Sequence, residues 1–369
     1  MPEKIKYSDV YLDSRRLLAD PDADTFVEEV FADPIRKKKL QEWMMLETSS
    51  DALDQLKLDY PHVSFISNSA DLPDWAEPEL MCQGSAFFAR HSEMIMSLLG
   101  LLSLPYCYTA AKGAMVLHLT ELIRKQTTKR LFDTAIFIWE VLAPGAFDEK
   151  GKAFAEILKV RIIHAFVRQY ILSNDKWDQA WGLPVNQEDM AGTNLSFSLI
   201  VIRGLRKLGY RVSKSDEEAF LHIWAVIGFL SGLEKELIPE NPIQAELLDG
   251  RIKHRQFASS VHGKELTYSL IGHILSVNES KATANDIRGL MRYLLGDEIS
   301  EQLAIDSPAL PAYKLILIRL LGAVKSVKPP GDLNRKYKLA FSEFKLRNPA
   351  LTTNLPAGRQ PTTNNQPLA

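Results

Sequence analysis

Lys159-Val-Arg-Ile-Ile-His-Ala-Phe-Val-Arg168 is a stretch with one histidine between two arginines. Apolar residues at positions 160, 163, 167 and 171 recur at intervals of three and four, which predicts an amphipathic helix over about 155–172. His164 falls on the same stripe. Because residues three and four apart are neighbours on a helix surface, Arg161 and Arg168 border the imidazole from the preceding and following turns.

This cluster has two interpretations. A haem group has a flat apolar body, an iron that accepts an imidazole nitrogen and two propionates that bind arginine, so each part of the cluster matches one part of haem. A single histidine on an apolar face is also typical of ordinary core packing, and spacing alone leaves both interpretations open. His222 is a competing ligand, and the nearby Gly228 and Gly232 allow close approach of a helix or a flat cofactor.

Composition excludes several classes of protein. The 369 residues are 46% hydrophobic and 24% charged, which is typical of a globular protein, and a net charge of −2 predicts no nucleic-acid partner. The two cysteines, Cys82 and Cys107, form no CxxC or CxxCH pattern, so a zinc site, an iron–sulfur cluster and covalently attached haem are not expected. Any haem is therefore expected to be b-type. The patterns HExxH, GxGxxG and the P-loop do not occur.

Helical periodicity dominates the chain and sustained period-two alternation is scarce, which predicts an all-α fold. We expect a helical N-terminal arm over 1–60, a main helical body over 61–346 and a disordered tail over 347–369. The stretch Met94–Ala111 carries no charge, but Pro105 interrupts it, so two buried helices are expected there in preference to a membrane span. Peripheral membrane contact stays open. The polar N-terminus lacks a secretory signal pattern, which favours a cytoplasmic location.

Four segments, taken in order, resemble the rubber oxygenase (latex-clearing protein) and MpaB-type oxygenase catalytic family. They are Arg130-x-x-x-Thr134, Arg161-x-x-His-Ala-x-x-Arg168, Pro184-Val-Asn-Gln-Glu-Asp189 with Phe197-Ser198, and His222-x-Trp-x-x-x-Gly228. The resemblance implies a globin-like helical core enlarged by additional helices, with the iron of haem b bound by His164. It also implies that Arg130 and Thr134 lie on the distal side of the haem, and that dioxygen and a small apolar unsaturated substrate are the reactants.

Two positions depart from the family pattern. Asp133 stands where rubber oxygenases can have a lysine immediately before the threonine, and Ala114 lies near the point where the family has a proposed glutamate base. Glu121 is the nearest alternative. We therefore expect a different distal site and a smaller isoprenoid or lipid as substrate. The alternatives are a non-enzymatic helical haem- or lipid-binding protein and a membrane-peripheral helical protein without haem; oligomeric state is not predicted.

Overall fold

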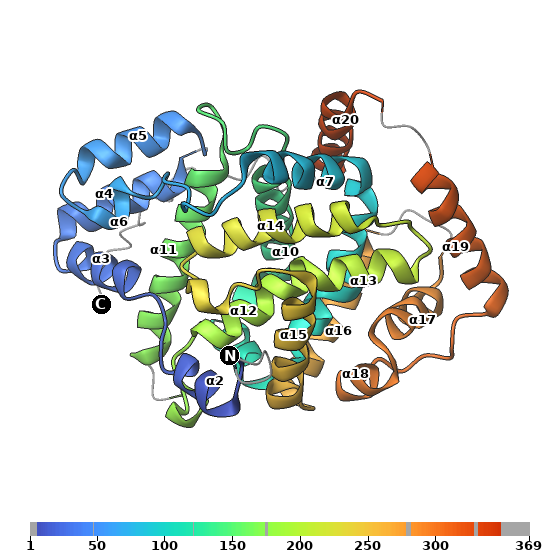
Figure 1. Ribbon diagram of the computed structural model, residues 1–369. Helices are drawn as coiled ribbons and strands as arrows, with labels where there is room; N and C mark the ends of the chain where they lie inside the picture. The colour runs from blue at the N-terminus through green and yellow to red at the C-terminus, as the bar shows by residue number, and fades with distance from the viewer. Residues whose placement is uncertain are drawn as a thin grey trace, which may run out of the picture.

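Two long helices, α7 (Pro78–Leu98) and α14 (Lys214–Leu230), lie side by side at the centre of the fold (Figure 1). Gly84 makes their close contact possible, because a Cβ atom there would lie 2.6 Å from the carbonyl oxygen of Ala219. The computed structural model describes residues 6–46, 48–120, 122–173, 176–277, 282–327 and 331–347, without the side chains of 122–127 and 327.

The remaining helices surround this pair. In chain order they are α2 (Asp9–Arg16), α3 (Pro21–Phe31), α4 (Pro34–Met45), α5 (Ser50–Asp59), α6 (Ser64–Ser67), α8 (Leu104–Thr109), α9 (Ala111–Leu119), α10 (Leu122–Val141), α11 (Ala153–Leu172), α12 (Gln187–Phe197), α13 (Leu199–Lys207), α15 (Pro242–Gln256), α16 (Val261–Ser276), α17 (Ala284–Leu295), α18 (Asp297–Gln302), α19 (Ala312–Val327) and α20 (Leu333–Leu346). Over the described ranges there is no strand, only an isolated bridge between Ala110 and Phe257. The predicted all-α class is confirmed.

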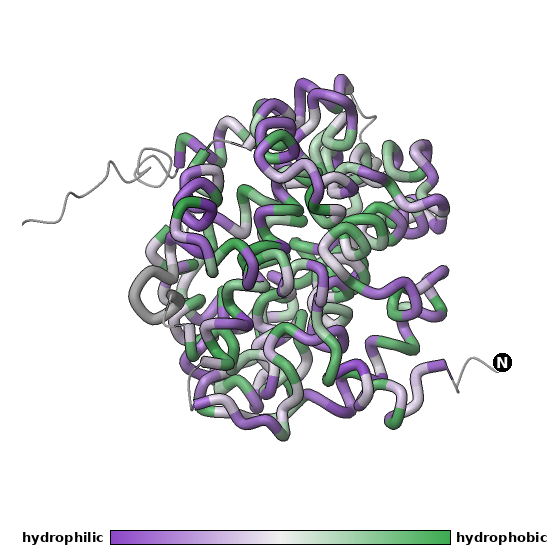
Figure 2. The backbone as a smooth tube through the Cα atoms, turned by 90° about the vertical axis from the view of Figure 1, so that its left-hand side faces the viewer, coloured by the Kyte–Doolittle hydropathy of each residue, from purple (hydrophilic) through white to green (hydrophobic). Residues whose placement is uncertain are grey.

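The N-terminal helices α3 to α6 pack on one side of α11 (Figure 1). Phe26 and Leu56 from this group form a core with Leu158 and Ile162 of α11. The hydropathy tube shows apolar residues concentrated toward the inside of the molecule (Figure 2). Helix α11 also contributes Ala153 and Ile157 to the main core, so it contacts both groups of helices. The predicted domain boundary at residue 60 stays a prediction. The predicted disordered tail, from residue 348 onward, lies outside the described residues.

Helix α11 is confirmed, but the residues that it buries are not those of the predicted apolar stripe. Ile163 is 44% exposed, and Val160 and Val167 are only partly buried. The buried apolar residues of the helix are instead Ala153, Ala155, Ile157, Leu158, Ile162, Ala165 and Ile171. The single-stripe prediction was wrong because α11 contacts the N-terminal helices on one side and α9 and α10 on another, so its buried residues occupy more than one face.

The uncharged stretch Met94–Ala111 is buried or partly buried except at Ser97, which is exposed, and it packs in the main core in agreement with the prediction. It comprises the end of α7, a π-helical turn over Leu99–Ser103 and then α8, with Pro105 in the first turn of α8. The helical backbone continues through this junction, since Ser103 has helical φ and ψ and the amide of Leu104 donates to the carbonyl oxygen of Leu99. Pro105, which has no N–H group, thus follows directly after the wider π-helical turn. In the part of the chain that the structure describes, no helix is long and apolar enough to cross a bilayer.

Candidate functional site

His164 lies in the middle of α11 and is partly buried. Its Nδ1 atom is buried and has no hydrogen-bond partner among the described residues. Burial, with smaller contributions from the cations Arg168 and Arg130, lowers the pKa of His164 to about 4, and Asp20 opposes this shift. The imidazole is therefore neutral at pH 7, the form in which a ring nitrogen binds a metal ion.

Arg130 and Thr134 lie one turn apart on α10, and both are partly buried. Burial lowers the pKa of Arg130, while Tyr108 on α8 opposes the shift. Burial also raises the pKa of Tyr108 to about 12, and the positive charge of Arg130 acts against this. The charge of Arg130 therefore acts on both His164 and Tyr108. Tyr108 belongs to α8, and α10, which carries Arg130, packs against α11, which carries His164. The sequence offered no signal for Tyr108.

The two departures from the family pattern have different surroundings. Asp133 is a surface residue: its side chain is 58% exposed and accepts a hydrogen bond of 2.8 Å from Lys129. Ala114 on α9 is buried in the main core. Glu121, the alternative base, lies outside the described residues. The carboxylate that replaces the family lysine is therefore engaged at the surface of α10.

The two arginines beside His164 form ion pairs with the beginning of α3. Arg161 donates from Nη2 to Oδ1 of Asp20 at 2.8 Å and from Nε to the other oxygen of the same carboxylate. Arg168 donates from Nε to Asp24 at 2.7 Å, while its Nη2 atom is buried with no partner among the described residues. Gly232 has φ +94° and sits against this pair, since a Cβ atom there would lie 2.4 Å from Asp20.

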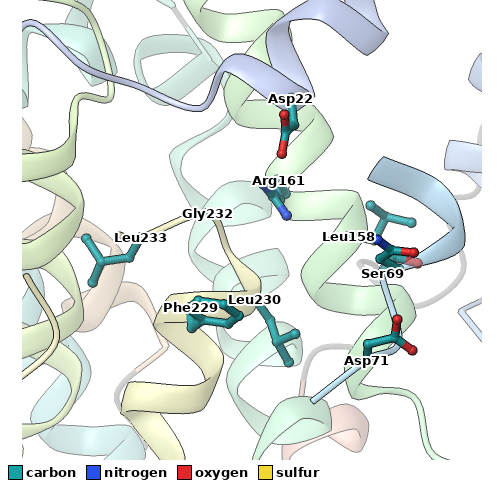
Figure 3. A pocket seen from close by; sticks show the side chains of 10 residues that line it. Asp22, Ser69, Asp71, Leu158, Arg161, Phe229, Leu230, Gly232 and Leu233 are labelled. Atoms are coloured by element: carbon teal, nitrogen blue, oxygen red, sulfur yellow. The ribbon is translucent and has the colours of Figure 1, made fainter. Parts of the chain in front are cut away.

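A cavity of about 270 Å³ adjoins Arg161 on the side of the N-terminal helices (Figure 3). Leu158, Phe229 and Leu230 form its apolar walls, and Asp22 and Asp71 contribute carboxylates. His164 is not among the residues that line it. Over the described residues, no group of three or more His, Cys, Asp or Glu side chains is arranged to hold a metal ion.

The segment Pro184–Asp189 has structural contacts that account for its polar residues. Asn186 caps α12 by accepting from the amide of Asp189, and Gln187 donates to the carbonyl oxygens of Ala19 and Gly232. Glu188 is fully buried, and its carboxylate accepts from Arg16, Arg255 and Gln256. This network joins α2 to α12 and α15.

His222, the competing ligand, is engaged elsewhere. Its Nε2 atom accepts a 2.9 Å hydrogen bond from the amide of Glu77 at the start of α7, and its ring contacts Trp75 edge to face. Gly228 permits close packing of α12, because a Cβ atom there would lie 2.7 Å from Nδ2 of Asn194. The glycines of this region therefore serve helix and turn packing.

The fold and the sequence together place this chain among all-helical oxygenase catalytic domains. The sequence profile described as "ER-bound oxygenase mpaB/B'/Rubber oxygenase, catalytic domain" matches residues 89–325, and the chain belongs to this family. The rubber oxygenase of Streptomyces sp. (strain K30) is 25% identical over 244 residues, which cover 65% of this chain and 60% of that protein. The structure of latex clearing protein LCP in the closed state shares the fold, with a TM-score of 0.71 and 21% identity over 94% of this chain and 93% of the other.

Proposed function

We propose that this protein is a haem b-dependent oxygenase that uses dioxygen to oxidise a small apolar unsaturated substrate of isoprenoid or lipid type. The observation that carries the proposal is the buried, unpartnered Nδ1 of His164, on a ring that stays neutral at pH 7, in a chain of an oxygenase family. A buried ring nitrogen without a hydrogen bond is costly, and a bond to iron at the imidazole would offset that cost.

The surroundings of His164 fit such a cofactor. Because successive helix residues are rotated by about 100°, Val160 and Val167 lie to one side of His164 and the two arginines lie to the other. The valines, with Ile163, leave apolar surface incompletely covered, which suits the flat body of a haem. Arg168 has a buried N–H group available for a propionate, whereas Arg161 would share its guanidinium between Asp20 and the other propionate.

We assign to Arg130 and Thr134 the part of the site where dioxygen would react. Bound haem would supply a ferrous iron that binds dioxygen. The partly desolvated guanidinium of Arg130 would stabilise negative charge that develops on the reacting oxygen atoms. The Thr134 hydroxyl would donate a hydrogen bond to the same oxygen atoms. In the cleavage form of the reaction, the C=C and O–O bonds break and two C=O bonds form. Both oxygen atoms enter the products, so no external reductant is needed.

A second candidate function is binding of haem or a lipid without catalysis. Ala114, an apolar residue buried in the core near the position of the family's proposed base, favours this alternative. A protein that retains the proximal histidine but lacks the base would still bind haem. Oxygen consumption separates the two functions, because only the oxygenase consumes dioxygen when an alkene substrate is present.

The test begins with the absorption spectrum of protein purified from haem-supplemented cells. We expect a Soret band with about one haem per chain, and loss of that band in His164→Ala. His222→Ala is the matched control and should keep its haem, because its ring nitrogen is bonded to the amide of Glu77. A wild-type protein that stays colourless after reconstitution contradicts the proposal. Carbonyl products labelled from ¹⁸O₂, formed from a panel of isoprenoids, would then identify cleavage.

A further inference from the structure

Helix α19 presents an apolar face that no other described element covers. Six large apolar residues along its 16 residues are between 53% and 67% exposed. They are Tyr313, Ile316, Leu317, Leu320, Leu321 and Val324. Their spacing of three and four residues places them on one side of the helix. Isolated exposed apolar residues are ordinary, but a continuous row of this kind marks an interaction surface.

The opposite face of α19 is fixed to the rest of the fold. Gly322 lies against the C-terminal end of α13, because a Cβ atom there would be 2.2 Å from the carbonyl oxygen of Leu208, the residue that follows the helix. Ser326 accepts a 3.0 Å hydrogen bond from the amide of Arg211. Figure 1 shows α19 at the edge of the molecule, with its length along the outside. Packing on one side therefore holds the apolar face outward.

Cations border the apolar face on both sides. With about 100° between successive residues, Lys314 and Lys325 lie beside one edge of the apolar row and Arg319 lies beyond the other edge. Lys314 forms an ion pair with Asp286, and Arg319 and Lys325 are exposed. The helix sequence contains no acidic residue. An apolar face with basic borders complements a surface that is apolar inside and negatively charged outside.

We propose that α19 lies in the headgroup region of an anionic phospholipid bilayer and holds the protein at that surface. At about 24 Å, the helix is shorter than the roughly 30 Å hydrocarbon core, and its charged borders suit a position parallel to the membrane plane. A second copy of the chain is a less suitable partner for this face. In a two-fold contact the basic borders of the two α19 helices would lie next to each other, and their like charges would repel. The proposal is independent of the haem proposal, because α19 contributes no residue to the site around His164.

Vesicle flotation of the full-length protein tests this inference. We expect binding to vesicles of 70% phosphatidylcholine and 30% phosphatidylglycerol, weaker binding to phosphatidylcholine alone, and release as salt concentration rises. The double variant Ile316→Glu/Leu320→Glu should weaken binding more than about tenfold. Arg319→Gln and Lys325→Gln should each weaken it about fivefold, because each cation near the surface contributes. Ile243→Glu is the matched control, since Ile243 is 70% exposed on α15 and should not affect flotation.

Two results would overturn the proposal. One is a wild-type protein that does not float with anionic vesicles, and the other is a double variant, folded by circular dichroism, that floats as well as the wild type. If the wild type does not float and is dimeric by light scattering while the double variant is monomeric, the face of α19 is a contact with a second copy.

Discussion

Arg161 in the middle of α11 donates two hydrogen bonds to Asp20, the residue that caps the start of α3. Asp20 is only 4% exposed, and the same carboxylate accepts from the amide of Ala23. One of the two arginines that flank His164 along the helix is thus oriented by the residue that begins α3. Helix α3 therefore contributes to the position of α11, and through it to the candidate site.

Asp20→Asn should destabilise the fold by about 2–3 kcal/mol, because it leaves the Arg161 guanidinium without its counter-ion in a largely buried place. Urea denaturation measures this change. Asp133→Asn is the matched control: it removes a carboxylate from an exposed pair with Lys129 and should change the free energy of unfolding by less than about 0.5 kcal/mol. Equal effects of the two substitutions would show that the pair between Asp20 and Arg161 does not stabilise the fold.

Glu188→Gln should also destabilise the protein, by about 3 kcal/mol, because the fully buried carboxylate of Glu188 accepts from both Arg16 and Arg255. The effect should be on folding alone. If the protein binds haem as proposed, variant protein that is folded at low temperature should bind the same amount of haem per chain as the wild type, because Glu188 is bonded to α2 and α15. A variant of normal stability that has lost haem would instead place Glu188 in the cofactor site.

Arg130→Met should raise the pKa of His164 in the apoprotein, because the Arg130 cation disfavours protonation of that ring. Nuclear magnetic resonance of histidine-labelled protein follows the titration directly. Lys129→Met is the matched control, since Lys129 is paired with Asp133 at the surface. If the two variants gave the same pKa for His164, Arg130 would not face the histidine.

The stability of the apoprotein should fall as the pH drops from about 6.5 to 4. His91 and His164 both have pKa values lowered to about 4, mainly by burial, from an ordinary value of 6.5. Within that range the unfolded chain binds more protons than the folded chain, so stability is retained above pH 6.5 and lost toward pH 4. Each histidine contributes up to roughly 3 kcal/mol to the loss.

His91→Phe separates one of these contributions. His91 is 6% exposed and its ring lies edge to face with Phe87 and Tyr210, so phenylalanine preserves the aromatic contacts and removes the titration. Denaturant midpoints of this variant should decline less between pH 6.5 and 4 than those of the wild type. An unchanged decline would show that His91 is not neutral in the folded protein.

Much of the fold was accessible from local sequence pattern. The sequence predicts the helix that carries His164 over 155–172, and it spans Ala153–Leu172 in the structure, although its buried residues do not follow the single predicted stripe. Near residue 198 the structure differs from the local pattern. Helical periodicity predicts one helix over 187–208, but the backbone at Ser198 has φ −109° and ψ −82°, and α12 ends there before α13 begins.

The sequence alone determined the all-helical class, the family resemblance and the choice of His164, because these depend on residue type and on spacing within one helix. Only the tertiary structure decided which neighbours each side chain has. It paired Arg161 with Asp20, turned His222 toward the amide of Glu77, and brought Tyr108 within electrostatic range of Arg130. These partners are far apart in the chain or on different helices. Their contacts depend on how whole helices pack, and the periodicity of one helix carries no information about that packing.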